Sequence, residues 1–445
     1  MKKAISMLMA LGMCSTLLAG CGGAASSAAT SSTAASSTEA SSVASSEAAA
    51  PEEEVTLKVS TWDATSNPSD TDAIAAFEAA NPNIHIELMD IPSADYTTKL
   101  SVMLNGGSDL DAFWIKDADT TKTLADKGQL VDLTDRVASA GIDMAGYNGV
   151  DKNFNFDGKQ YAMPIRTDYY VMFYNKDVFD AASVAYPTND WTWTDFEETA
   201  KTLTSGTGAE KTYGAFIHTW QACVENWGVQ DGKNTIMDYQ TGYDFFKPYY
   251  DMAVRMQADG TIQDYGELKT GNIHYSSPFA KGTVGMMPMG TWFMATMAEK
   301  VKTGESTVNW GVATLPHPEG VEAGYTVGST TPMAINAAST KQDAAWKFVE
   351  FMSGEGGAAS YAADGYIPAM STTETLKTLG AIDGMPEGLA EALVTKNISA
   401  DRPITDKVSE VNQMLGEEHS LIMLGELSVD DGLAEMATRA GEILG

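Results

Sequence analysis

The sequence predicts an α/β fold with enough chain for two domains. Segments in which apolar residues alternate with polar ones are followed by segments with apolar residues at helical spacing, which is typical of βαβ units on a mostly parallel sheet. The chain has 445 residues, of which 44% are hydrophobic, so it can fill more than one hydrophobic core. No segment recurs at a fixed period, which argues against a solenoid or a propeller.

Strands and helices alternate through the first half of the chain. Alternating apolar residues predict strands over 55–62 and 84–88, and an apolar run predicts a third strand over 110–115. Apolar residues at helical spacing predict helices over 74–80 and 96–104, the first of which ends at an Asn-Pro-Asn sequence. In open sheets of this kind, ligands bind beyond the carboxyl ends of the strands.

The same alternation continues in the second half. Thr194 and Glu197 have the spacing of a capping box, which predicts the start of a helix that runs to Leu203. Further elements follow from the same two periodicities. The predicted strands cover 170–174, 283–287 and 310–313, and the predicted helices cover 291–301, 341–352 and 429–444.

The N-terminus has the pattern of an export signal. Lys2 and Lys3 precede an apolar stretch over 4–18, which is shorter than the roughly 20 residues that a membrane-spanning helix needs. Leu18-Ala19-Gly20-Cys21 resembles the lipobox of bacterial lipoproteins, which implies that residues 1–20 are removed and that the thiol of Cys21 carries lipid. The alternative is an ordinary signal peptide that a cysteine happens to follow.

Residues 21–54 predict a tether. Beyond Cys21 this segment is almost entirely Ser, Ala, Thr, Gly and Glu, and it cannot bury enough apolar surface to offset the entropy of ordering. We expect a disordered spacer that lifts the folded part off the membrane. Once Cys14 is removed and Cys21 is lipidated, Cys223 has no partner for an intramolecular disulfide.

The charge balance limits the classes of partner. Lys and Arg total 28 against 60 Asp and Glu, which gives a formal net charge of −32. Such a surface disfavours nucleic acid and anionic lipid as direct partners, so we expect a neutral or cationic ligand. The acidic residues are spread over the folded region, where their ordinary role is solubility.

Catalytic and metal-binding signatures are missing from the sequence. The five His residues are scattered without an HExxH pair, and no GxSxG, GxxxxGK[ST] or GxGxxG sequence occurs. Asp109, Asp111, Asp117 and Asp119 lie close together but lack the glycine and terminal glutamate of an EF-hand, so we interpret them as turn and cap residues. We therefore expect no catalytic residue, no metal and no cofactor.

Several segments, taken in order, resemble the family 1 extracellular solute-binding proteins of bacterial ABC importers, the group that includes maltose-binding protein. Their order and spacing extend across nearly the whole chain after the tether, although no single segment is specific. The matching segments are FEAANPNI at 77–84, DGKQYAMP at 157–164, YNKDVF at 174–179, WTDF at 193–196, FAKG at 279–282, GTW at 290–292, WKFV at 346–349 and GYIP at 365–368.

The resemblance implies two α/β lobes around a ligand cleft, joined by a hinge that the chain crosses more than once. We expect the N-terminal lobe to contain residues 55–163 plus 315–364. The C-terminal lobe is then expected to contain residues 165–313 plus 366–445.

Candidate ligand-binding residues combine aromatic rings with charged side chains, because a sugar offers apolar faces and hydroxyl edges. Trp62, Asp63, Trp114 and Asp117 follow or end predicted strands, and Arg166, Asp168 and Tyr169 lie near the expected crossover. The resemblance places Trp292 at an aromatic platform. The remaining candidates are Trp220, Tyr325, Ser329 and Tyr366.

The predicted function is capture of a carbohydrate for an ABC permease by a monomer that is lipid-anchored on the outer face of a bacterial cell membrane. Two alternatives remain open. The same scaffold could bind a non-sugar such as a polyamine, a peptide or a metal complex. An exported glycoside hydrolase would instead need two carboxylates at a defined separation.

Overall fold

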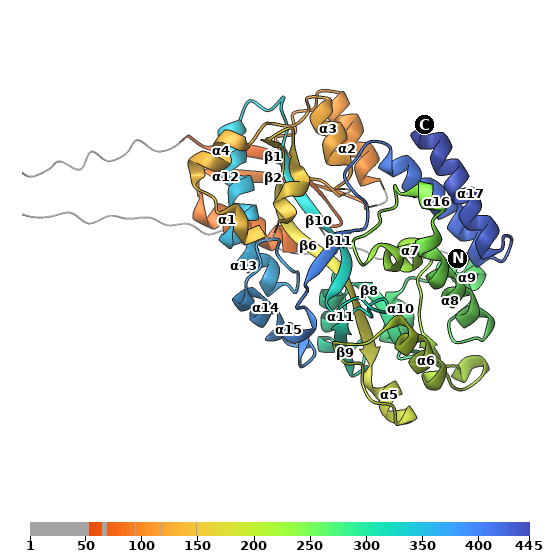
Figure 1. The fold of residues 1–445 in the computed structure, drawn as a ribbon. Coiled ribbons are helices and arrows are strands. Elements are labelled where there is room, and N and C mark those ends of the chain that lie inside the picture. The colour runs from red at the N-terminus through yellow and green to blue at the C-terminus, as the bar shows by residue number, and fades with distance from the viewer. Residues whose placement is uncertain (1–52, 65–68, 94, 117, 148) are drawn as a thin grey trace, which may run out of the picture. The chain divides into compact units, whose positions relative to one another are not determined.

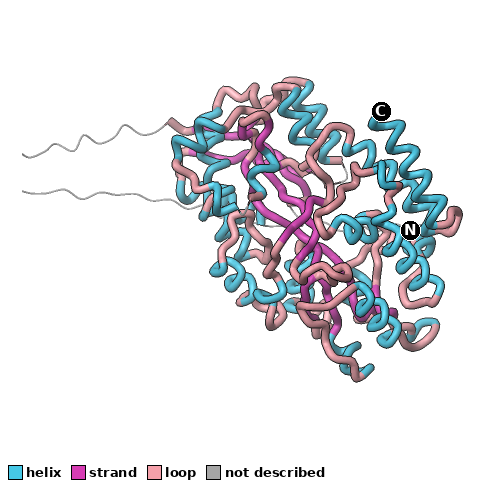
Figure 2. Tube along the Cα trace, viewed as in Figure 1, coloured by secondary structure: helices cyan, strands magenta, loops and turns pink. Residues whose placement is uncertain are grey.

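Strands from distant parts of the chain join one mixed sheet. The computed structural model describes residues 53–445 except 65–68, 94, 117 and 148. Within these described residues, nine strands form the sheet, with the path β2-β1-β3-β10-β6-β8-β7 and with β9 and β11 paired to β6 and β10 (Figure 1). Figure 2 shows these strands, in magenta, with helices around them. The predicted α/β fold of the periplasmic-binding-protein type is confirmed.

The first part of the sheet is parallel, as predicted. β1 (Val55–Trp62) pairs in parallel with β2 (Ile84–Ile91) on one side and with β3 (Ala112–Trp114) on the other. Helices α1 (Ser69–Ala80) and α2 (Tyr96–Asn105) connect these strands. The carboxyl ends of β1 and β3 therefore lie at the same edge of the sheet.

Two long strands run through both parts of the sheet. The first residues of β6 (Met163–Asn175) pair antiparallel with β10 (Tyr325–Ile335). The last residues of β6 pair antiparallel with β8 (Val284–Gly290) and β9 (Trp310–Thr314). Each of these two strands is thus one uninterrupted segment of chain. The shorter strands β7 (Tyr213–Ala215) and β11 (Asn397–Ala400) pair in parallel with β8 and β10, and β4 (Asn155–Phe156) pairs with β5 (Lys159–Gln160) in a small separate hairpin.

The remaining helices flank these strands, and no helix among the described residues is long and apolar enough to cross a bilayer. Their bounds are α3 (Thr120–Asp126), α4 (Thr134–Ala140), η1 (Met144–Tyr147), η2 (Val150–Phe154), α5 (Lys176–Ala182), α6 (Trp193–Leu203), η3 (Gly208–Glu210), α7 (Ala222–Val229), η4 (Tyr239–Thr241), η5 (Asp244–Phe246), α8 (Lys247–Ala258), α9 (Tyr265–Thr270), α10 (Ser276–Ala280), α11 (Phe293–Lys302), α12 (Gln342–Ser353), α13 (Glu355–Ala363), α14 (Thr373–Gly380), α15 (Leu389–Ala392), α16 (Val408–Met423) and α17 (Val429–Leu444).

The cap of α6 differs from the prediction. Trp193 is already helical, so the N-cap is Thr192, whose Oγ1 accepts a hydrogen bond from the backbone N–H of Asp195 at 3.2 Å. The side chain of Asp195 accepts the backbone N–H of Thr192 in return. The predicted pair of Thr194 and Glu197 was wrong by two residues, and Glu197 instead pairs with Arg255 on α8.

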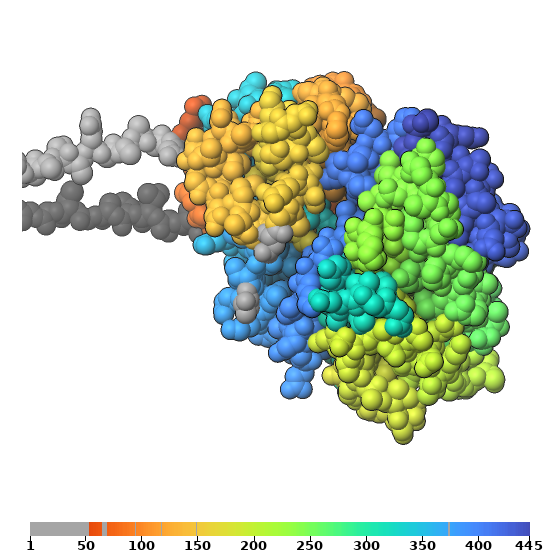
Figure 3. All heavy atoms as spheres, in the orientation of Figure 1, coloured from red at the N-terminus to blue at the C-terminus, as the bar shows by residue number. Residues whose placement is uncertain are grey.

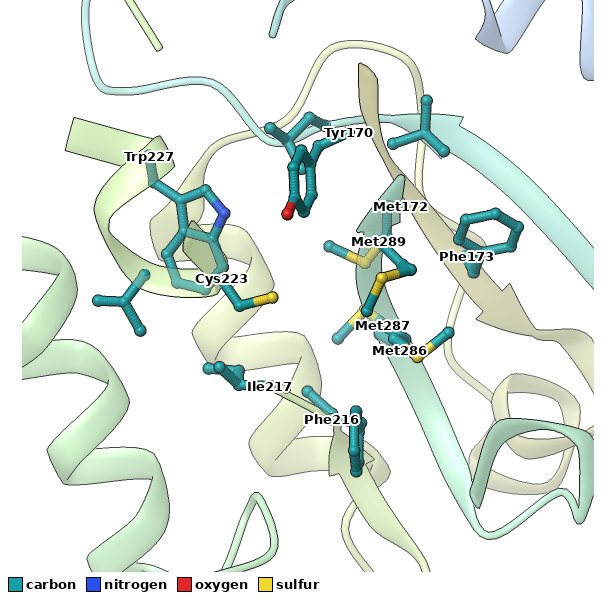
Figure 4. Packing of buried hydrophobic residues seen from close by; sticks show 14 of the residues in the cluster. Tyr170, Met172, Phe173, Phe216, Ile217, Cys223, Trp227, Met286, Met287 and Met289 are labelled. Carbon is teal, nitrogen blue, oxygen red and sulfur yellow. The ribbon is translucent and has the colours of Figure 1, made fainter. Parts of the chain in front are cut away.

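Buried apolar side chains form three clusters. Two of them contain residues of β1, β3 and their covering helices, with the start of β6 and the end of β10. The largest consists mostly of residues between 169 and 440 and includes the second half of β6. Figure 4 shows Met172, Met286, Met287 and Met289 of this cluster gathered near Phe173. Figure 3 shows that residues from the beginning, the middle and the end of the described chain all contribute to one face of the molecular surface.

Candidate functional site

A buried ion pair lies in the middle of β6. Nε of Arg166 is 3.4 Å from Oδ2 of Asp168, and the two side chains are 13% and 8% exposed. Oδ1 of Asp168 accepts a hydrogen bond from Oγ1 of Thr291 at 3.1 Å, which joins β6 to the residue that follows β8. Burial raises the pKa of the Asp168 carboxyl, and the positive charge of Arg166 opposes that shift. The pair thus places hydrogen-bond donors and acceptors next to each other.

Aromatic rings flank the guanidinium of Arg166. Its Cζ lies 5.1 Å from the ring centroid of Tyr366 and 5.9 Å from that of Trp62. Trp62 ends β1, is half-buried and lies 5.2 Å from the ring of Tyr96. Nε of Arg166 is buried and has no hydrogen-bond partner among the described residues. The rings therefore add cation–π attraction to the ion pair, in which Nε lies 3.4 Å from Asp168 without a hydrogen bond.

A second group of rings surrounds Trp292. This half-buried side chain makes an edge-to-face contact with Tyr170 at 5.6 Å and lies 6.4 Å from Trp220. Trp220 is 40% exposed and makes edge-to-face contacts with His218 at 4.5 Å and with Tyr275 at 5.6 Å. Burial lowers the pKa of His218 to about 4, so this ring is neutral at physiological pH.

The ion pair contacts the first aromatic group directly and is linked to the second only through Thr291. Trp62 contacts Arg166, and Trp292 directly follows Thr291, the hydrogen-bond partner of Asp168. Indole faces next to a charged pair suit a ligand with apolar faces and hydroxyl edges. Within the described residues, no group of three or more His, Cys, Asp or Glu side chains is arranged to hold a metal ion.

Three further predictions concern Asp63, Asp117 and Cys21. Asp63 adopts a left-handed backbone conformation with φ of 51°, and its Oδ1 accepts the backbone N–H of Ser93 at 2.9 Å. Asp63 therefore stabilises the turn after β1 with at least one carboxylate oxygen. Asp117 and Cys21 lie outside the described residues.

Trp114 is a core residue, and its predicted place in a ligand site is wrong for this structure. Its side chain is 1% exposed and packs edge-to-face against Phe348 of α12 at 6.0 Å. Its indole Nε1 donates a hydrogen bond to the hydroxyl of Tyr361 on α13 at 3.2 Å. The ring is thus covered by helices that follow some 230 residues later in the chain.

Tyr169 points away from the ion pair, because neighbouring strand residues face opposite sides of a sheet. Its hydroxyl donates to the backbone oxygen of Leu393 at 2.8 Å, and its ring is 4% exposed. With Thr167 it lines a separate cavity of about 640 Å³. The predicted role of Tyr169 beside Asp168 is therefore not supported by its orientation.

Tyr325 and Ser329 lie on β10. Ser329 is directly opposite Asp168 in the antiparallel register and lines a smaller cavity of about 210 Å³. Tyr325 begins the strand, and its backbone oxygen accepts a hydrogen bond from Nε2 of Gln230 at 2.7 Å. Of these two residues, the register brings Ser329 beside the ion pair.

Sequence reasoning missed Thr291, Tyr170, His218 and Tyr275. Thr291 directly precedes the predicted Trp292, so it was the easiest of these to find. Tyr170 follows two positions after Asp168 on the same strand, which is the spacing of residues on one face. His218 and Tyr275 lie in loops, and no periodicity links them to the site.

Comparison with known protein families gives a match over residues 63–359 to the bacterial extracellular solute-binding proteins. The match covers more than half of the chain. This chain belongs to that family. The predicted membership is thus confirmed, and with it a solute-binding role in a family of extracellular bacterial proteins.

Solved structures agree with this family assignment. A sugar transporter of Rhizobium etli, in an open conformation, is 41% identical with a TM-score of 0.78, over 87% of this chain and 99% of its own. An ABC substrate-binding protein of Listeria monocytogenes in complex with cycloalternan is 22% identical with a TM-score of 0.76, over 88% and 100%. A putative binding protein of Brucella abortus is 22% identical over 88% of this chain and 93% of its own.

Proposed function

We propose that this chain captures a sugar or oligosaccharide outside the cell and delivers it to an ABC permease. The observation that carries the proposal is the buried pair of Arg166 and Asp168, which adjoins Trp62 and is linked through Thr291 to Trp292. Paired charges supply directed hydrogen bonds to hydroxyls, and indole rings cover the apolar faces of a sugar. The 41% identity to a sugar transporter supports a carbohydrate ligand.

Closure of two lobes would couple binding to delivery. We assign residues 55–163 plus 315–364 to one lobe and residues 165–313 plus 366–445 to the other. Trp62 then belongs to the first lobe and Trp292 to the second, so a ligand that contacts both favours the closed arrangement. The continuous strands β6 and β10 are suited to act as the hinge. β6 pairs with β10 and with β8, and β10 pairs with β3 of the first lobe and with β11 of the second.

The proposal also includes a lipid anchor at Cys21 and an ABC permease as the partner. Cleavage before Cys21 and lipidation of its thiol would hold the monomer on the outer face of the membrane, and residues 21–54 would let it reach the permease. ATP hydrolysis would belong to another subunit. The solute would be released unchanged, since capture by hydrogen bonds and stacking alters no covalent bond.

A ligand panel tests the function. Tryptophan fluorescence and calorimetry with sugars, polyamines and peptides are expected to reveal binding of a sugar. Trp62→Ala and Trp292→Ala are each expected to weaken that binding about tenfold or more, because each removes a stacking face. Tyr186→Ala is the matched control, since Tyr186 is an exposed ring that packs against Tyr174 and Phe179.

Two results would contradict the proposal. Tight binding of a polyamine or peptide with no response to any sugar would assign the scaffold to another solute. Continued appearance of shorter sugars during incubation with an oligosaccharide would identify a hydrolase.

A further inference from the structure

A second cavity lies on the face of β6 that is opposite the ion pair. Thr167 and Tyr169 line it, and neighbouring strand residues face opposite sides, so Arg166 and Asp168 point away from it. Its other walls come from η2 and from the segment that leads into β11. The volume is about 640 Å³, within the range of roughly 300–1,000 Å³ that is typical of small-molecule sites. We call it the rear cavity.

The charged side chains that line the rear cavity are all basic. Of its 18 lining residues, Lys152 and Lys396 are basic and none is acidic, although acidic residues outnumber basic ones by 60 to 28 in the whole chain. Lys152, in η2, forms no ion pair with any residue that the structure describes. Two ammonium groups without a carboxylate in the same lining favour an anion over a neutral molecule or a cation.

The ammonium group of Lys396 has a partner outside the lining. Its Nζ lies 2.8 Å from Oε2 of Glu322, and the two side chains are 57% and 75% exposed. This contact raises the pKa of Lys396, so the side chain stays charged. Exposed ion pairs are weak, so the carboxylate of a ligand can take the place of Glu322.

Apolar side chains cover much of the remaining wall. Ile367, Leu376 and Ile398 line the rear cavity, and Val394 lines it while being 60% exposed. Covering such an aliphatic side chain removes apolar surface from water, which is favourable. The lining therefore suits a molecule that has an apolar body and a negatively charged group.

We propose that the rear cavity binds a small organic anion, whose carboxylate or phosphate group is held by Lys152 and Lys396 and whose apolar body packs against Ile367, Leu376 and Val394. This site is separate from the candidate site for the captured solute. The inference therefore goes beyond the proposed function and does not depend on which solute is captured.

Calorimetry of the full chain with four small aromatic probes tests the proposal. Benzoate and phenyl phosphate are the anions, benzyl alcohol is the neutral counterpart, and benzylammonium is the cation. At least one anion is expected to bind about tenfold or more tightly than benzyl alcohol, and benzylammonium to bind no better than the alcohol. Comparison of the two anions tells a carboxylate site from a phosphate site. Added salt is expected to weaken binding of the anion.

Charge variants locate the bound anion. Lys152→Gln and Lys396→Gln are each expected to weaken its binding about threefold or more, because each removes one positive charge. Glu322→Gln is expected to strengthen binding about twofold, since it removes the carboxylate that competes for Lys396. Lys233→Gln is the matched control, because Lys233 is an exposed lysine that pairs with Asp231 at 2.8 Å and does not line the cavity.

Thermal unfolding of each variant shows whether the fold is intact. No binding of either anion, or equal affinity for the anions and benzyl alcohol, would overturn the proposal. Binding of an anion that folded Lys152→Gln and Lys396→Gln variants both leave unchanged would do the same. None of these results bears on capture of a sugar, which is measured with other ligands.

Discussion

Arg166 and Asp168 stabilise each other at a position where neither charge would be tolerated alone. Both side chains are almost fully removed from solvent, and the carboxylate has one further hydrogen bond, from Thr291. Desolvation of a charge costs several kcal/mol, which the partner must offset. The same burial keeps water from competing with a ligand hydroxyl for the pair.

Removal of one charge of the Arg166–Asp168 pair should lower the free energy of unfolding more than removal of both charges. Arg166→Met is expected to lower the free energy of unfolding by about 3 kcal/mol, because Asp168 is then a buried charge without a cation. The double variant Arg166→Met with Asp168→Asn is expected to recover part of that loss. Urea unfolding of the two single variants and the double variant measures the coupling. Strictly additive losses would show that the two groups do not interact.

The sequence predicted much of the chemistry of the site but not the direction of every side chain. Trp62, Arg166, Asp168 and Trp292 were selected from strand ends and family segments. The structure places Trp62 and Asp168 beside Arg166, and Trp292 directly follows Thr291, the hydrogen-bond partner of Asp168. Trp114 was selected by the same reasoning and lies in the core instead. The helices that cover it, α12 and α13, are too distant in the chain for local periodicity to place them.

Three helices share a buried polar network in the second half of the chain. The hydroxyl of Tyr250 on α8 donates to Oε1 of Glu225 on α7 at 2.8 Å and lies 3.0 Å from Nδ1 of His419 on α16. Burial raises the pKa of Glu225 to about 8 and lowers that of His419 to about 3. At neutral pH the network is thus held largely without charge.

The raised pKa of Glu225 makes stability fall as pH rises from about 4.5 to about 8. Between pH 4.5 and pH 8 the folded state keeps a proton that the unfolded state releases, so the free energy of unfolding falls as pH rises, by at most about 1.4 kcal/mol per unit. Glu225→Gln, which cannot ionise, is expected to flatten this part of the profile. Urea unfolding at pH 5, 6.5 and 8.5 checks it, and parallel profiles for the two proteins would exclude the effect.

The lowered pKa of His419 changes stability in the opposite direction, because it makes stability fall as pH falls. His419 stays neutral in the folded state while the unfolded state takes up a proton, so stability is lost as pH falls from about 6.5 towards 3. His419→Asn is expected to reduce that loss, and urea unfolding at pH 4 and pH 7 measures it. An acid loss of the same size in both proteins would assign it to other groups.

The helices and strands differ in how well the sequence pattern predicted them. The predicted strand over 55–62 and the predicted helix over 429–444 match β1 and α17, because each has a clear period. β10 was missed, since Tyr325–Ile335 contains Gly328 and Pro332, residues that weaken a strand pattern. The register shift between Thr331 and Pro332 shows how the strand accommodates the proline.

At the scale of the whole molecule, several contacts join segments that are far apart in the chain. Asp119, just before α3, accepts a hydrogen bond from Oγ of Ser409 on α16 at 2.7 Å and lies 3.7 Å from Nη1 of Arg402. Lys122 lies 3.9 Å from Asp406. With the lobes assigned as above, these contacts join the two lobes and must break when the lobes separate.

Weakening this connection should favour the open form. Asp119→Ala is expected to lower the apparent affinity for the sugar severalfold, because a smaller fraction of the unliganded protein is closed. Small-angle scattering without ligand is expected to give a larger radius of gyration than for the wild type. An unchanged radius together with unchanged affinity would show that the contact has no influence on closure.

The unbroken passage of β6 through both parts of the sheet has a consequence for how this chain can change. Strand side chains alternate sides, so one inserted residue before Asp168 would turn its carboxylate toward the cavity that Thr167 and Tyr169 line, away from Thr291. Substitutions can vary the chemistry of this strand, whereas a gain or loss of a single codon would exchange its two faces. New specificities should therefore arise here by replacement, and length variation should be confined to surface turns.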